Sequence, residues 1–199
     1  MSTKIYWITD TIGIMPRPRG NEWLEDEIIA FKKQGVDIIV SLLEQSEITE
    51  LGLRQEKLLC EKHSIQFINF PIPDRSLPPK GRQTEAFIQT LTIPSKIVIH
   101  CRMGIGRSSI IAASILLYQN NNLHEKGNSP TYVKTMFRKK ATEIISHISH
   151  IRGLKVPDTE EQFQWLKERE QLLYKPVHHL IQRQSLHNDR ENNNDITSG

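Results

Sequence analysis

Four short runs of β-forming residues, separated by helical patterns, constrain the fold of this chain more than any other feature of its sequence. They occupy residues 4–9, 36–42, 65–70 and 96–101. Their interiors are almost continuously apolar, which is typical of strands that are covered on both faces of a sheet. Strands that alternate with helices favour a parallel arrangement. The sequence therefore predicts an α/β fold, with a central, mainly parallel sheet of four to five strands flanked by helices.

The rest of the chain divides into a packed region and a polar tail. A helix expected over residues 107–119 is apolar on almost every side, which predicts that it is buried. Pro176 ends the packed region, and from Arg183 onward the chain is polar and almost without large apolar side chains. We therefore expect one domain over residues 1–175 and a disordered tail over residues 176–199.

Composition argues against several classes of protein. No apolar run approaches the roughly 18 residues that a membrane-spanning helix needs, and the N-terminus lacks the pattern of a signal peptide. A net charge of +3 is compatible with an anionic substrate but does not indicate a nucleic acid partner. Two cysteines, Cys60 and Cys101, are too few for a disulfide framework. We expect a cytoplasmic monomer that binds neither nucleic acid nor membrane.

The segment HCRMGIGRSS, residues 100–109, follows the last apolar run and carries the strongest chemical signal. Cys101 and Arg107 are separated by five residues at a predicted strand-to-helix turn. Such a turn gathers backbone N–H groups and a helix N-terminus around one point, which makes an anion site. Gly104 and Gly106 allow the backbone to curl, and Arg107 can bind two oxygens of one phosphate. A thiolate at Cys101 would then be a nucleophile for phosphate monoesters.

This segment resembles the signature loop of the cysteine-dependent protein tyrosine and dual-specificity phosphatases. Over about residues 1–175 the order of strands and helices is also similar, most of all to small single-domain members such as kinase-associated phosphatase and its bacterial relatives. The resemblance implies the fold of that family, a phosphocysteine intermediate on Cys101, and phosphate binding by Arg107. It further implies that His100 sets the environment of the thiol and that Ser108 hydrogen-bonds its sulfur. The remaining phosphate-binding positions would be Arg102, Met103, Gly104, Ile105 and Gly106.

Asp74, in the segment FPIPDRSLPP, is the candidate proton donor. Departure of an alkoxide or phenoxide needs a proton from the side opposite the nucleophile. Asp74 follows the third strand on a proline-rich loop, 27 residues before Cys101, and this placement matches the mobile acid loop of the family. The same stretch is also a good turn, in which an aspartate can simply cap the backbone. We expect Asp74 to act as general acid and then as general base.

Three further residues are candidates for contacts with substrate or water. The segment 156–166 resembles the glutamine loop of the family, and Gln162 falls on one of its glutamines, although its side chain could also face solvent. Asp158 stands where the larger tyrosine phosphatases have their water-positioning glutamine. Arg17 and Arg19 lie in a predicted exposed turn after the first strand, where they would contact acidic groups beside the phosphate or form a solvated basic loop.

No cofactor is expected. The His178–His179 pair lacks neighbouring ligands, so the sequence does not predict a metal site. Cys60 could pair with Cys101 under oxidation, but a buried structural thiol is the simpler expectation.

The leading hypothesis is a metal-independent phosphatase that acts on protein phosphotyrosine, with phosphoserine and phosphothreonine left open, so the expected partner is a phosphorylated protein. A phosphoinositide phosphatase shares the loop but tends to carry a basic residue at the position of Ile105. A sulfurtransferase also uses a cysteine loop but does not need Asp74. A non-enzymatic module that binds phosphoproteins would not need Cys101, Arg107 and Asp74 together.

Overall fold

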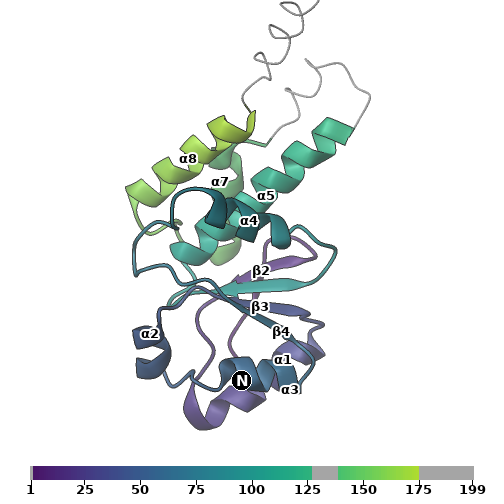
Figure 1. The fold of residues 1–199 in the computed structure, drawn as a ribbon, viewed down its shortest axis with the longest axis vertical. Helices are drawn as coiled ribbons and strands as arrows, with labels where there is room; N and C mark the ends of the chain where they lie inside the picture. The colour runs from purple at the N-terminus through teal and green to yellow at the C-terminus, as the bar shows by residue number, and fades with distance from the viewer. Residues whose placement is uncertain (1, 127–138, 175–199) are drawn as a thin grey trace, which may run out of the picture.

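A five-stranded sheet forms the middle layer of the protein (Figure 1). This computed structural model describes residues 2–126 and 139–174. The strands are β1 (Tyr6–Trp7), β2 (Ile12–Met15), β3 (Ile38–Ser41), β4 (Gln66–Asn69) and β5 (Ile97–His100). Their order is β1-β2-β5-β3-β4, and every neighbouring pair is parallel except β1 with β2. The mainly parallel sheet predicted from the apolar runs is confirmed.

The N-terminal edge of this sheet differs from the prediction. The strand expected over residues 4–9 shortens to β1, and the chain then turns back into β2. The Ile8 N–H group donates to the Ile12 carbonyl at 2.8 Å, and Thr9 Oγ1 accepts from the Ile12 N–H group at 3.0 Å. The pattern IGIM is only four residues long and contains a glycine, so its strand signal is weak. Pairing with β5 and β1 decides its conformation.

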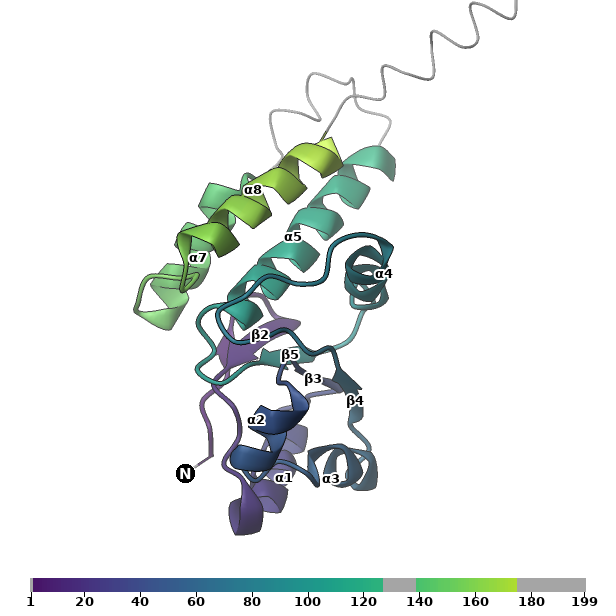
Figure 2. The same cartoon turned by 60° about the vertical axis from the view of Figure 1, so that its left-hand side comes forward.

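Helices cover both faces of the sheet (Figures 1 and 2). On one face lie η1 (Asn21–Trp23), α1 (Leu24–Lys33), α2 (Gln45–Glu50) and α3 (Glu56–Lys62). On the other lie α4 (Arg82–Thr90), α5 (Arg107–Lys126), α7 (Ala141–Arg152) and α8 (Glu160–Tyr174). The helix predicted to end at residue 119 is longer than expected. It packs along α8, where Asn120 donates to the Tyr174 hydroxyl at 3.4 Å, a contact that no local pattern reveals.

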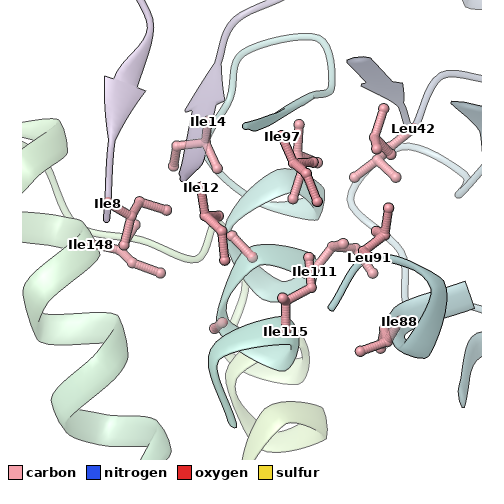
Figure 3. Packing of buried hydrophobic residues seen from close by; sticks show 14 of the residues in the cluster. Ile8, Ile12, Ile14, Leu42, Ile88, Leu91, Ile97, Ile111, Ile115 and Ile148 are labelled. Carbon is pink, nitrogen blue, oxygen red and sulfur yellow. The ribbon is translucent and has the colours of Figure 1, made fainter. Parts of the chain in front are cut away.

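Two apolar layers hold these helices to the sheet, and β5 contributes to both. Ile97 and Ile99 belong to the layer under α5, whereas Val98 belongs to the layer over α1 and α3. Figure 3 shows Ile111 and Ile115 of α5 facing the sheet within the first layer. Because side chains alternate along a strand, the residue after β5 points into the α5 layer, and this residue is Cys101.

The tail predicted over residues 176–199 lies outside the described residues, as do His178 and His179. The expected domain boundary at residue 175 therefore stays a prediction. None of the helices within residues 2–126 and 139–174 is long and apolar enough to cross a bilayer.

Candidate functional site

The segment of residues 101–107, here called the cysteine loop, connects β5 to α5 and is tightly packed on two sides. Gly104 has φ +66°, and a Cβ there would lie 2.5 Å from the carbonyl group of Met15. A Cβ on Gly106 would lie 2.7 Å from Gln162 Oε1. Gly104 is therefore required by the backbone of Met15 and by its own left-handed conformation, whereas Gly106 is packed against the side chain of Gln162.

Cys101 lies at a cavity of about 220 Å³ at the end of the sheet. The residue is 3% exposed, and the fully buried Ser108 places its Oγ 3.5 Å from the cysteine Sγ. The contact implied for Ser108 is therefore present. At least four other cavities of the described residues are larger, at about 290 to 590 Å³, but none of these four is lined by a cysteine. The cavity at Cys101 is lined by Asp74, Arg75, Cys101, Arg102, Met103, Ile105, Gly106, Arg107, Asp158 and Gln162.

Arg107 is almost completely buried beside Cys101 and is held from three directions. The two terminal nitrogens of Arg107 donate to the two carboxylate oxygens of Glu47 in a bidentate pair, at 2.7 and 2.8 Å. Arg107 Nη1 also donates to the Ile72 carbonyl at 2.9 Å, and Nη2 lies 2.8 Å from Asp74 Oδ1. The guanidinium plane is therefore fixed before any substrate binds, which is the geometry that bidentate phosphate binding requires.

Glu47 is the residue at this site that the sequence analysis missed. Burial opposes its ionisation, but hydrogen bonds from Arg107 and from the Glu44 N–H group outweigh burial and lower the pKa of Glu47 below its usual 4.5. Burial also opposes the charge of Arg107, yet the hydrogen bonds to Glu47 raise the pKa of Arg107. The available signal was topological: Glu47 follows β3, which lies next to β5 in the sheet, so their carboxyl ends share one edge.

Arg102 lines the cavity, but its guanidinium is paired with two carboxylates of α2. Its guanidinium lies 2.5 and 3.1 Å from the two carboxylate oxygens of Glu50 and 3.5 Å from Glu47. The hydrogen bonds with Glu50 raise the pKa of Arg102. This side chain is therefore engaged with α2 rather than extended toward the cavity mouth. Phosphate binding by the backbone of the cysteine loop stays a prediction.

His100 and Cys60 lie on the opposite side of the sheet from the Cys101 side chain. His100 is fully buried, and its Nε2 lies 3.0 Å from Oε1 of the buried Glu56 on α3. Its implied influence on the thiol stays a prediction. Cys60 is a buried free thiol in the α1–α3 layer, as expected. Burial and then the charge of Glu56 raise the pKa of Cys60, and the sheet separates the layer of Cys60 from that of Cys101.

The segment of residues 71–80, here called the acid loop, follows β4 and brings Asp74 to the cavity. The Asp74 side chain is 57% exposed and pairs with Arg107. Ser76, two residues later, donates its N–H group to the Pro73 carbonyl at 3.0 Å. This turn places a carboxyl group at the same cavity as the nucleophile candidate, as the sequence predicted.

Gln162, in the first turn of α8, and Asp158, just before this helix, line another side of the cavity. Gln162 is fully buried, so the alternative in which it faces solvent is wrong. Its Nε2 donates to the Ser76 carbonyl at 3.1 Å. Asp158 Oδ2 lies 3.3 Å from Arg75 Nε. Both side chains thus contact the acid loop.

The two arginines of the N-terminal turn are placed differently from the prediction. The turn is partly buried rather than exposed, and neither Arg17 nor Arg19 lines the cavity. Arg19 Nε pairs at 2.7 Å with the buried Glu27, and its guanidinium lies over the Trp23 ring at 5.0 Å from the centroid. Arg17 donates its backbone N–H group to the Arg102 carbonyl at 3.2 Å and so supports the cysteine loop through its main chain.

No metal-binding cluster exists in the part of the chain that the structure describes: three or more His, Cys, Asp or Glu side chains do not come together there in a suitable arrangement. The chemistry that the described site can perform comes from the sulfur of Cys101, the Arg107 guanidinium, the Asp74 carboxyl and the Ser108 hydroxyl.

Comparison with known proteins shows the family of the chain. Residues 13–121 match the family described as polymorphic toxin system, DSP-PTPase phosphatase. Cyclin-dependent kinase inhibitor 3 of Rattus norvegicus is 25% identical over 140 residues, which are 69% of this chain and 58% of the relative. The chain thus spans less than two thirds of the length of that curated relative.

Solved structures show the same fold. A kinase-associated phosphatase with serine in place of its catalytic-site cysteine has a TM-score of 0.69 at 19% identity, over 89% of this chain and 99% of that one. Tk-PTP in a glycine-to-alanine mutant form has a TM-score of 0.61 at 22% identity, over 86% and 96%. The fold implied by the resemblance is confirmed.

Proposed function

The chain belongs to the DSP-PTPase phosphatase family of polymorphic toxin systems, and we propose that it hydrolyses phosphate monoesters of proteins, phosphotyrosine above all. The observation that carries the proposal is one cavity of about 220 Å³ that is lined by Cys101, Arg107 and Asp74 together. A nucleophile, a phosphate-binding cation and a proton donor are the three groups that the reaction needs. A reducing cytoplasm suits a reaction that depends on a free thiol.

In the first step the Cys101 sulfur attacks phosphorus and forms the S–P bond. The bond from phosphorus to the leaving oxygen breaks, and that oxygen takes the proton of Asp74. Arg107 binds two of the remaining phosphate oxygens and stabilises the charge that they carry in the transition state. A phosphate oxygen replaces Asp74 as the second partner of Arg107 Nη2, which lies 2.8 Å from Asp74 Oδ1 without substrate, and the carboxyl is then free for proton transfer.

In the second step water attacks phosphorus, and the S–P bond breaks. Asp74, now a carboxylate, accepts the proton from the water and returns to its starting form. The Ser108 hydroxyl, 3.5 Å from Cys101 Sγ, donates to the departing thiolate and makes it a better leaving group. Inorganic phosphate is released, and the enzyme is regenerated without a cofactor.

The rim of the cavity favours an aryl phosphate on a protein over a phosphoinositide. Met103 is 59% exposed and lines the cavity with Ile105, so the mouth offers apolar contacts to an aromatic ring. Arg102, which could bind a second phosphate, is held by Glu50 instead. A headgroup with several phosphates would have to break this ion pair.

The deciding experiment compares wild type with Cys101→Ser on p-nitrophenyl phosphate and on a phosphotyrosine peptide. Cys101→Ser should abolish turnover of both and still bind inorganic phosphate, because serine lacks the thiolate while the anion site remains. Iodoacetate should inactivate wild type at neutral pH, and phosphate should protect it. Cys101→Ser activity within tenfold of wild type would disprove the mechanism.

Three further measurements separate the competing functions. Cyanide-dependent turnover of thiosulfate would indicate a sulfurtransferase, and faster phosphate release from phosphoinositide vesicles than from the peptide would overturn the substrate class. Binding of the phosphopeptide without any turnover would indicate a non-enzymatic module. A substrate-trapping pull-down with Cys101→Ser would then identify the phosphoprotein.

A further inference from the structure

The start of α8 lies between the cysteine loop and the acid loop and contacts both. Gln162 is fully buried there, and its Oε1 lies so close to Gly106 that a Cβ on this glycine would come within 2.7 Å. The same oxygen accepts from the Thr159 N–H group at 3.4 Å, while Nε2 donates to the Ser76 carbonyl at 3.1 Å. Both ends of the amide are thus engaged, one by Thr159 just before α8 and one by the acid loop.

A second contact joins the same two segments. Arg75 Nε lies 3.3 Å from Asp158 Oδ2, with side chains 67% and 38% exposed. Exposed ion pairs contribute little by themselves, so the buried bond of Gln162 should dominate. Arg75 has φ +57°, a conformation that L-residues other than asparagine, aspartate and histidine rarely adopt. The surrounding contacts must therefore hold this turn in place.

The turn that Gln162 holds is the one that carries Asp74. The Ser76 N–H group donates to the Pro73 carbonyl at 3.0 Å, and Ser76 Oγ donates to the Asp74 carbonyl at 3.4 Å. Because these bonds close around Asp74, fixing the Ser76 carbonyl also fixes the backbone from which the carboxyl group projects.

We propose that Gln162 is a positioning residue for the general acid, and that the Arg75–Asp158 pair is a second, weaker clamp on the same loop. The proposal rests on the proposed function, because it assigns to Asp74 the proton transfer described above. Gln162 would then act through the acid loop, since one of the two N–H groups of its amide is engaged by the Ser76 carbonyl.

The effect of losing this anchor should depend on the leaving group. A general acid works when it lies within hydrogen-bond reach of the leaving oxygen, and a misplacement of 1 Å can cost about 10²-fold. A released acid loop would place Asp74 correctly less often. Turnover should therefore fall for phenols of high pKa, which need the proton, and change little for phenols of low pKa.

The test is a plot of log kcat/KM against leaving-group pKa for aryl phosphates, with wild type, Gln162→Met and Gln162→Glu. Methionine keeps the length of the side chain without charge, and glutamate keeps its shape but cannot donate to Ser76. Both should lose about tenfold on phenyl phosphate and at most about twofold on p-nitrophenyl phosphate, which steepens the slope. The matched control is Gln171→Glu, at an exposed position of the same helix, and its line should coincide with that of wild type.

The second clamp is tested by Arg75→Asn and Asp158→Asn. Asparagine tolerates the left-handed conformation at residue 75, so this change removes the cation without adding strain. Each variant should steepen the slope less than Gln162→Met does. The slope of the double variant should be no steeper than that of either single variant, because each single change already removes the same ion pair. Arg82→Ala, at an exposed arginine of α4, is the control.

Hydrogen–deuterium exchange adds a measurement that does not depend on activity. Gln162→Met should speed exchange over residues 71–80 and leave α1 unchanged. Two results would overturn the proposal. One is that Gln162→Met exchanges residues 71–80 at the rate of wild type. The other is that wild type is active and the plots of log kcat/KM against leaving-group pKa are parallel for wild type and Gln162→Met. Failure of the proposed function would look different, because wild type would then hydrolyse none of the aryl phosphates.

Discussion

The cysteine loop and the acid loop meet at one cavity, but the protein holds them by different means. The cysteine loop joins a fully buried strand to a buried helix, and Cys101 and Arg107 are only 3% and 2% exposed. The acid loop follows β4, at the edge of the sheet, and the side chain of Asp74 is 57% exposed. Core packing together with buried hydrogen bonds therefore fixes the proposed nucleophile and the proposed phosphate-binding cation, whereas a few more exposed polar contacts place the proposed acid. Changes in the first loop should affect every substrate, and changes in the second only those that need a proton.

Arg107→Lys should give the largest loss. Lysine keeps the charge, but it cannot bind two phosphate oxygens in a plane or satisfy Glu47 in the same way. Loss of one transition-state donor typically costs about 10²–10³-fold, and we expect about 10³-fold in kcat/KM. The loss should be equal for p-nitrophenyl phosphate and a phosphotyrosine peptide, since both present the same phosphate group. Activity within tenfold of wild type would show that another residue binds phosphate.

Asp74→Asn should separate the two loops most clearly. General acid catalysis contributes about 10²–10⁴-fold, and the exposure of Asp74 points to the lower end, because water can partly replace it. We expect a loss of about 10² on phosphotyrosine and a much smaller one on a phenol of low pKa. Rates plotted against leaving-group pKa test this. Parallel lines for wild type and variant would show that Asp74 only caps a turn, and Asp158 would be the next candidate.

Gly104→Ala should show how closely the cysteine loop is packed. The matched control is Gly153→Ala, because the two glycines have φ +66° and +69° but only Gly104 has backbone atoms within 3 Å of an added Cβ. The left-handed conformation alone costs about 1–2 kcal/mol, and overpacking adds about 1–3 kcal/mol at Gly104. Urea denaturation should therefore show a larger loss in the free energy of unfolding for Gly104→Ala. Equal losses would mean that the contact with Met15 relaxes easily.

Glu47→Gln should have the smallest effect, and one that depends on pH. The pKa of Glu47 is lowered in the folded state, so its ion pair stabilises the fold above the unfolded value of about 4.5 and loses this contribution as pH falls through the folded pKa. Removing a hydrogen bond to a charged group typically costs about 1–3 kcal/mol, and we expect this at pH 7. The difference from wild type should shrink below about pH 4.5. Glu50→Gln, an exposed partner of Arg102, is the control and should change stability by less than about 1 kcal/mol. A difference that is the same at pH 7 and pH 3 would contradict the assignment.

Local patterns were sufficient for the parts of the molecule that depend on neighbours in the chain. Apolar runs predicted the strands β3 and β5, because a strand buried on both faces needs nearly every residue to be apolar. β4 also forms where it was predicted, but its expected burial on both faces is wrong: it is an edge strand whose residues are exposed or half-buried. The spacing of Cys101 and Arg107 predicted the loop, since five residues span the turn from a strand to a helix. The same reasoning failed for β2, whose four residues carry too weak a signal without their partners.

The sequence by itself determined the α/β class, the nucleophile and phosphate-binding candidates and the carboxyl group at Asp74. Only the tertiary structure decided what holds them: Glu47 meets Arg107 across 60 residues, Gln162 reaches Ser76 across 86, and Arg19 turns away to Glu27. Parallel crossovers bring Glu47 and Arg107 to one edge of the sheet, and the packing of α8 on α5 brings Gln162 to the acid loop. The partners in these contacts are charged or polar residues of common types, and no spacing along the chain distinguishes them from solvated side chains. The strand order and the burial that follows from it select the partners, and both arise only when the chain is folded.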